Sequence, residues 1–96
     1  LSENHIKEIA KLEITLIRKR LELLGYELHL TSEAEDFISQ KGFDKKYGAR
    51  ALKRTIQTYL EDLLCDVLMN DEAQSNKVLK IGINKEADNL CLLNND

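Results

Sequence analysis

The chain has 96 residues, 43% hydrophobic and 32% charged, which suits one domain with a single modest core. Its 14 Lys and Arg residues against 17 Asp and Glu residues give a net charge of -3, which excludes a general positive field for nucleic acid or anionic membranes. No apolar run approaches the roughly 20 residues that span a bilayer and no charged-then-apolar leader is present, so we expect an intracellular, cytoplasmic protein.

The first predicted element is a helix over residues 2–25, SENHIKEIAKLEITLIRKRLELLG. Ser2 is placed to cap its start, and Gly25 is placed to end it in a left-handed conformation. At about 100° per residue, the apolar side chains form two strips along this helix. The first strip is expected to face the core and contains Ile6, Ala10, Ile14, Ile17, Leu21 and Leu24. The second contains Ile9, Leu12, Leu16 and Leu23, and it faces either the rest of this fold or a ligand or second domain.

A short strand and a second helix follow. The segment YELHLT (26–31) alternates apolar and polar residues and carries β-compatible side chains, which predicts a strand. Ser32 and Glu35 have the spacing of a capping box, so we expect a helix from Ser32 to about Lys41. Gly42 is expected to stop this helix.

The segment FDKKYG (43–48) reads as a loop, and a third helix is predicted from about Ala49 to Asn70. Apolar residues recur along it at helical spacing and predict one buried stripe. This stripe contains Leu52, Ile56, Tyr59, Leu60, Leu63, Leu64 and Val67.

After a polar connection, two strands are predicted at about 77–83 and 90–93, joined by a turn through Asn84 to Asn89. The element order is therefore α-β-α-α-β-β. We predict an α+β fold in which the helices pack on a small three-stranded sheet, with strand 26–31 beside the terminal pair. The whole chain, 1–96, is expected to be a single domain, with 94–96 as a loose tail. Because it begins with Leu1 and not methionine, we also expect it to be part of a longer protein.

Catalytic and metal-binding patterns are not apparent in this sequence. No Ser/His/Asp or Cys/His catalytic set can be recognised in the sequence, and no GxxxxGK[ST] phosphate loop is present. Cys65 and Cys91 lack the close pairing of a zinc site or the density of a disulfide scaffold, and His5 and His29 have no ligand-like neighbours. We expect no metal site and no independent enzyme activity.

The strongest chemical signal is a basic cluster in residues 41–54, interrupted only by Asp44. It contains Lys41, Lys45, Lys46, Arg50, Lys53 and Arg54. Such a run is commonly a solvated face. Arg50 differs because it follows Gly48 at the start of a helix, where close backbone approach, unpaired N–H groups and a planar guanidinium all favour phosphate oxygens. From the residues alone, phosphate binding and a helix start paired with acidic groups of the same chain both remain open.

The string GFDKKYGARALKR (42–54) resembles the GFD-x-x-[YF]-GAR-x-L-[KR]-R signature in the C-terminal small subdomain of Clp-family AAA+ unfoldases. The I-x-x-I-A-x-L-E pattern of the first helix, LGYELHLT and SEAEDFISQKG are similar as well. The resemblance is specific over 42–54 and weaker after about residue 70. Many relatives have proline where this chain has Ala51. Proline at an early helical position only presets the backbone angle φ, so we expect alanine to be tolerated there.

The resemblance implies a role for particular residues. In this family the small subdomain closes over ATP bound to a larger nucleotide-binding subdomain, and the arginine of GAR is the second sensor that touches the phosphates. Carried over by motif, the sensor is Arg50, with Gly48 and Ala49 beside the nucleotide. The strip containing Ile9, Leu12 and Leu16 is where an adenine-facing side chain is expected. Magnesium would be held only by the larger subdomain.

The resemblance also implies partners. These are the large subdomain of the same chain, neighbouring subunits of a homohexamer, protein substrates of an ATP-dependent unfoldase, and in some members a Clp peptidase. Nucleic acid and membrane are not expected. Whether the whole protein is a chaperone for disaggregation or a protease partner stays open. The alternative function is a small binding module that uses the 41–54 cluster for nucleic acid or docks a protein partner.

Overall fold

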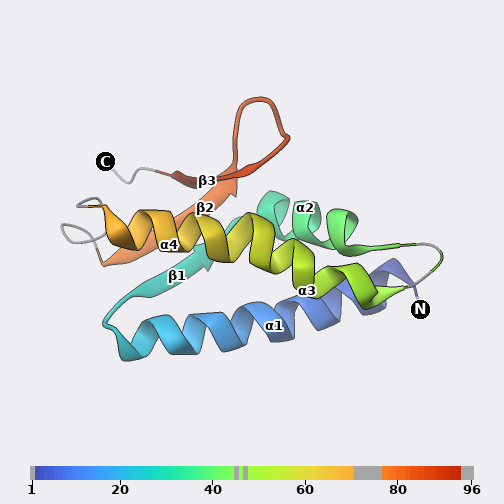
Figure 1. Cartoon of the computed structure of the whole chain (residues 1–96), viewed down its shortest axis with the longest axis horizontal. Coiled ribbons are helices and arrows are strands. Elements are labelled where there is room, and N and C mark those ends of the chain that lie inside the picture. Colours follow the sequence, from blue (N-terminus) through green and yellow to red (C-terminus); the bar gives the residue numbers. More distant parts are fainter. Residues whose placement is uncertain (1, 45, 47, 71–76, 94–96) are drawn as a thin grey trace.

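The computed structural model describes residues 2–44, 46, 48–70 and 77–93. The elements are α1 (Glu3–Leu23), β1 (Glu27–Leu30), α2 (Ser32–Gly42), η1 (Ala49–Ala51), α3 (Leu52–Thr55), η2 (Ile56–Glu61), α4 (Asp62–Met69), β2 (Val78–Ile83) and β3 (Leu90–Leu93). Figure 1 shows how they are arranged. The predicted α+β class, with helices on a three-stranded sheet in the order α-β-α-α-β-β, is confirmed.

Both ends of α1 are fixed as the sequence predicts. The Ser2 side chain accepts a hydrogen bond from the His5 N–H, and the His5 ring accepts from the Ser2 N–H, which completes a capping box. At the other end Gly25 has φ +88°, and the N–H of Tyr26 donates to the carbonyl of Leu21 at 3.0 Å. This is a Schellman motif, which needs a residue that tolerates positive φ.

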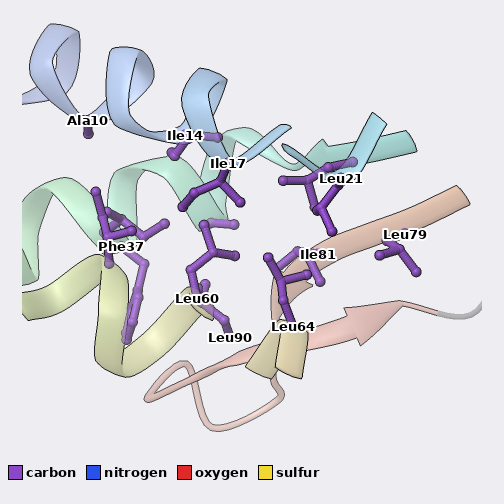
Figure 2. Packing of buried hydrophobic residues seen from close by; sticks show 14 of the residues in the cluster. Ala10, Ile14, Ile17, Leu21, Phe37, Leu60, Leu64, Leu79, Ile81 and Leu90 are labelled. Atoms are coloured by element: carbon purple, nitrogen blue, oxygen red, sulfur yellow. The ribbon is translucent and has the colours of Figure 1, made fainter. Parts of the chain in front are cut away.

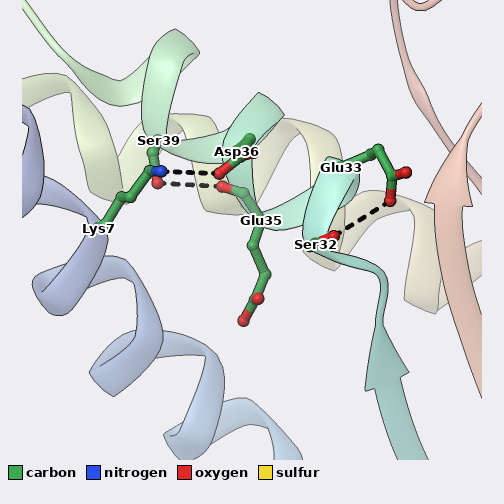
Figure 3. Close-up of polar contacts among 6 residues, drawn as sticks. All are labelled: Lys7, Ser32, Glu33, Glu35, Asp36 and Ser39. Carbon is green, nitrogen blue, oxygen red and sulfur yellow. Dashed lines mark hydrogen bonds and ion pairs between the residues drawn. The ribbon is translucent and has the colours of Figure 1, made fainter.

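The start of α2 corrects one prediction. Its N-cap is Thr31, whose Oγ1 accepts from the Ala34 N–H at 3.1 Å, whereas Ser32 donates to Glu33 (Figure 3). Thr31 is still extended because its N–H donates to the carbonyl of Ile81 in the neighbouring strand. The chain therefore changes from strand to helix one residue earlier than the predicted capping box placed it.

Helix α2 ends at Gly42, as predicted. Gly42 is itself the last helical residue and is not in a left-handed conformation, and the following Phe43 is extended. A Cβ on Gly42 would lie 2.5 Å from Leu52 Cδ1 and 3.0 Å from Leu52 Cα. The Thr55 hydroxyl also donates to the carbonyl of Lys41 at 3.2 Å. Glycine is needed here because the backbone of α2 approaches the start of α3 closely.

The predicted third helix is a continuous helical path from Ala49 to Met69, but its hydrogen bonding changes along the way. It begins as a 3-10 turn, becomes α-helical, widens to a π-helix over Ile56–Glu61 and returns to an α-helix. Four buried residues recur every fourth position, and in an α-helix such a pattern drifts by about 40° per step. The wider π turn offsets this drift and keeps them on one face. They are Leu52, Ile56, Leu60 and Leu64.

The sheet has the order β1-β2-β3, so the predicted first strand does lie beside the terminal pair. β1 and β2 are parallel with Leu28 opposite Leu79, and β2 and β3 are antiparallel with Gly82 opposite Cys91. The latter two strands are joined through Asn84–Asn89, as predicted. The central strand is thus supplied from the C-terminal part of the chain, and it holds both neighbours in the sheet.

The core gathers side chains from α1, α2, the α3–α4 path and the sheet. Figure 2 shows side chains of α1 pointing toward those of the α3–α4 path and of β2. The first strip of α1 is buried as predicted except for Leu24, which is 64% exposed because it lies beyond the last helical residue, Leu23. In the stripe of the third helix, Tyr59 and Leu63 are only half-buried. The buried residues from α1 are Ile6, Ala10, Ile14, Ile17 and Leu21.

An ion pair connects α1 and α2, and a hydrogen bond holds a buried serine within α2. Lys7 Nζ lies 3.0 Å from Asp36 Oδ1, and the buried Ser39 donates to the carbonyl of Glu35 at 3.0 Å (Figure 3). Both partners of the ion pair are about half exposed, so it contributes at most about 1 kcal/mol. Apolar burial therefore dominates the packing of these helices. Within the described ranges, no helix combines the length and apolar composition needed to cross a bilayer.

We predict that Gly42→Ala destabilises the domain by about 1–3 kcal/mol, because the added methyl group must displace Leu52 and the start of α3. Urea unfolding of the 96-residue domain measures this effect. Gln40→Ala, at an exposed position of the same helix, is the matched control and should change stability by less than about 0.5 kcal/mol. Equal stability of the two variants would show that the close contact is not required.

Candidate functional site

The loop after α2 is closed on itself by its own backbone. The Asp44 N–H donates to the Gly48 carbonyl at 3.0 Å, and the Gly48 N–H donates to the Asp44 carbonyl at 2.7 Å. The Asp44 carboxylate accepts from the Lys46 N–H at 2.7 Å, as in an Asx turn. Because the loop is closed this way, the position of Asp44 fixes where the following helical path begins.

Gly48 makes the turn from this bridge into η1. Its φ of +66° and ψ of -119° lie in a region that residues with a Cβ rarely adopt. Ala49 follows at once in η1, where it is half-buried and packs against the core. The glycine therefore lets Ala49 pack inward while the next residue, Arg50, is exposed.

Arg50 lines a hollow of about 300 Å³ at the start of the helical path. The other described residues that line it are Asp44, Ala51 and Arg54. The hollow is thus lined by two arginines and one aspartate. The sequence placed both arginines in the basic cluster, but it did not show that Asp44 and Arg54 share a hollow with Arg50. The spacing of four between the two arginines was the available signal.

The rest of the basic cluster is placed differently. Lys41, Lys46 and Lys53 are exposed, and none of them is among the described residues that line this hollow. Lys41 Nζ lies 5.7 Å from the centroid of the Phe37 ring, a cation–π contact within the fold. Lys45 lies outside the described residues. Among the described cations of the cluster, Arg50 and Arg54 are the ones that line this hollow.

The second strip of α1 is divided. Ile9 is half-buried and packs on the core, whereas Leu12 is 68% exposed and Leu16 is 56% exposed. None of the three is among the described residues that line the hollow at Arg50. Leu23, the last residue of the predicted strip, is 88% exposed, so three leucines of this strip face solvent. Among the described residues, the strip and Arg50 therefore do not share this hollow.

The histidines contact residues close to them in the sequence, and the cysteines form no disulfide. His5 takes part in the α1 cap, and His29 Nε2 lies 2.5 Å from Glu27 Oε2 on β1. Cys65 is exposed on α4 and Cys91 is half-buried on β3, and both are free thiols. Among the described residues, no three His, Cys, Asp or Glu side chains are grouped as they are at a metal site.

The α+β fold, together with a GFD–GAR segment that presents an arginine at the start of the third helical path, defines this chain as the C-terminal small subdomain of a Clp ATPase. Over residues 1–81 it matches the family described as the C-terminal, D2-small domain, of ClpB protein, and it belongs to that family.

Similar proteins include the Chaperone protein ClpB of Oceanobacillus iheyensis, 37% identical over 92 residues that cover 96% of this chain and 11% of the relative. The Chaperone protein ClpB of Bacteroides thetaiotaomicron is 38% identical over 84 residues, covering 88% of this chain and 10% of the relative. The Chaperone protein ClpB of Vibrio cholerae is 42% identical over 69 residues, covering 72% of this chain and 8% of the relative. The chain thus spans about a tenth of the length of these relatives.

We predict that Gly48→Ala costs about 1–3 kcal/mol of stability, because alanine must adopt a sparsely populated backbone conformation or break the bridge to Asp44. Thermal and urea unfolding of the domain would measure the loss. Lys53→Ala, at an exposed site of the same region, serves as the control and should stay within about 0.5 kcal/mol. If Gly48→Ala is as stable as this control, the positive φ imposes no constraint.

Proposed function

We propose that this domain is the ATP-sensing lid of a Clp-type AAA+ protein unfoldase, with Arg50 as the second sensor that contacts nucleotide phosphate. The observation that carries the proposal is the placement of Arg50, exposed beside a hollow at the start of a helical path that the closed Asp44–Gly48 loop holds in position. Gly48 and Ala49 lie directly before it and would border the nucleotide.

The remaining parts of the nucleotide site belong to the large subdomain of the same chain, which would supply the phosphate loop and the ligands of Mg²⁺. The contribution of this domain is a guanidinium group that forms charge-assisted hydrogen bonds to phosphate. A contact that differs between ATP and ADP shifts the balance between orientations of the two subdomains. Phosphate charge would in this way be converted into rotation of the lid.

We assign the exposed strip of α1 to the other end of the nucleotide. Leu12 and Leu16, with Ile9 at their edge, offer an apolar surface that suits an adenine ring held between the subdomains. Burying the two leucines there would also remove apolar surface from water when the lid closes. The strip and Arg50 would then contact different parts of one ATP molecule.

For the whole protein we propose a cytoplasmic homohexamer in which the rotation of each lid is felt by the neighbouring subunit and drives the movement of a protein substrate. The relatives are named chaperones, which favours remodelling or disaggregation of proteins over delivery to a Clp peptidase. The rival function, nucleic-acid binding by the 41–54 cluster, is opposed by the net charge of -3 and by the Asp44 carboxylate beside both arginines.

We predict that Arg50→Ala changes the stability of the domain by less than about 1 kcal/mol, because an exposed side chain contributes little to folding. In the full-length protein the same change should lower ATP turnover by at least about tenfold, since a charge-assisted contact to phosphate is lost. Melting of the domain and ATP turnover of the full-length protein are measured side by side.

Arg50→Lys is the conservative variant and should restore only part of the turnover, because a point charge cannot reproduce the two-pronged contact. The opposite pattern, a large loss of stability with normal turnover per folded molecule, would identify Arg50 as a structural residue. The nucleic-acid alternative is checked with the same variants by measuring RNA and DNA binding as salt is raised. Binding that falls steeply with salt and depends on Arg50 would favour that alternative.

A further inference from the structure

Arg54 shares the hollow with Arg50 and comes one helical turn later in the chain. The spacing of four places both side chains on the same side of the path, and both are exposed. The neighbouring Lys53 is also exposed, but it is not among the described residues that line the hollow. Two adjacent cations of the cluster thus have different surroundings.

Local helix energetics do not favour this pair of arginines. Like charges four residues apart destabilise a helix by about 0.2–0.5 kcal/mol. Arg50, in the first turn, also opposes the helix dipole, which favours anions there. The Asp44 carboxylate in the same hollow balances only one of the two positive charges. A polyanionic ligand between the two guanidinium groups would turn both penalties into favourable interactions.

The Asp44 carboxylate restricts which anion can bind. Its Oδ1 accepts from the Lys46 N–H at 2.7 Å and its backbone is bridged to Gly48, so its negative charge is a fixed part of the hollow. The ionisable groups Asp44, Arg50 and Arg54 therefore sum to a single positive charge. An anion with one charge gains little there, whereas a phosphate with several charged oxygens can engage both guanidinium forks.

We propose that Arg54 is a second phosphate-contacting residue, which forms with Arg50 a clamp for the terminal phosphate of a nucleoside triphosphate. This inference rests on the proposed function of Arg50. A single arginine contacts phosphate through one guanidinium group, whereas two arginines bind separate phosphate oxygens. Binding to separate oxygens makes the contact sensitive to whether the terminal phosphate is present. Arg54 therefore sets much of the preference of the lid for ATP over ADP.

The test uses the full-length protein with Arg54→Gln and Lys53→Gln. The two variants remove one positive charge from adjacent residues, but only Arg54 lines the hollow. Affinities for ADP and for a hydrolysis-resistant ATP analogue are measured by titration, with turnover recorded as KM and kcat separately. Arg54→Gln should reduce the ATP-over-ADP preference by about tenfold, the loss of one charge-assisted contact. Lys53→Gln should leave that preference within about twofold, and Arg54→Lys should recover part of it.

Arg50→Gln, measured in parallel, separates the two proposals. If Arg50→Gln loses the preference for ATP while Arg54→Gln behaves like Lys53→Gln, the clamp is overturned and the sensor role of Arg50 stands. If neither arginine variant alters the preference, the proposed function itself fails. Melting and hexamer assembly are recorded for each variant. A lost preference that accompanies lost assembly would overturn the clamp, because it would make Arg54 a structural or interface residue.

Asp44→Asn gives an independent check, since asparagine keeps an oxygen that can accept from the Lys46 N–H but removes the charge. Without the carboxylate, ADP should bind more tightly relative to the ATP analogue, so the preference should fall by severalfold. An unchanged ATP-over-ADP preference in Asp44→Asn would overturn the role that we assign to the Asp44 carboxylate.

Discussion

The close contact between Gly42 and Leu52 is the constraint on which the placement of the site depends. The last residue of α2 lies so near the start of α3 that a Cβ there would displace Leu52, and the hydroxyl of Thr55 donates to the carbonyl of Lys41 across the same junction. The intervening loop must therefore turn back within a few residues. The bridge between Asp44 and Gly48 achieves this turn, and the chain enters η1 with Arg50 exposed.

The same junction separates buried residues from residues that line the hollow. Leu52 and Thr55 face inward and are buried, whereas Arg50 and Arg54 face the hollow. Since a helical path presents different faces to core and solvent, packing one face fixes the direction of the other. The core thus fixes the side of the helical path on which the two arginines lie.

Much of the fold follows from the sequence because its signals are local. The Ser2 cap and the Gly25 stop predict the two ends of α1. The apolar spacings predict the helices and strands and their order. What the sequence did not predict depends on tertiary contacts: Gly42 ends α2 as predicted but also lies in close contact with Leu52, and the π segment keeps four buried side chains on one face. Likewise, the motif predicts Arg50 as the sensor, but only the folded loop places Asp44 at the same hollow. Sequence spacing predicts elements better than it predicts which side chains meet across a loop.

The most direct test of the central claim, that Arg50 couples nucleotide state to lid orientation, is a distance measurement in the full-length protein. A spin label on the exposed Cys65 of α4 and a second label in the large subdomain report the orientation of the lid, with the other thiols replaced. The account predicts different distance distributions with an ATP analogue and with ADP, and a single distribution for both nucleotides in Arg50→Gln. A nucleotide-dependent shift that persists unchanged in a folded, nucleotide-saturated Arg50→Gln hexamer would contradict it.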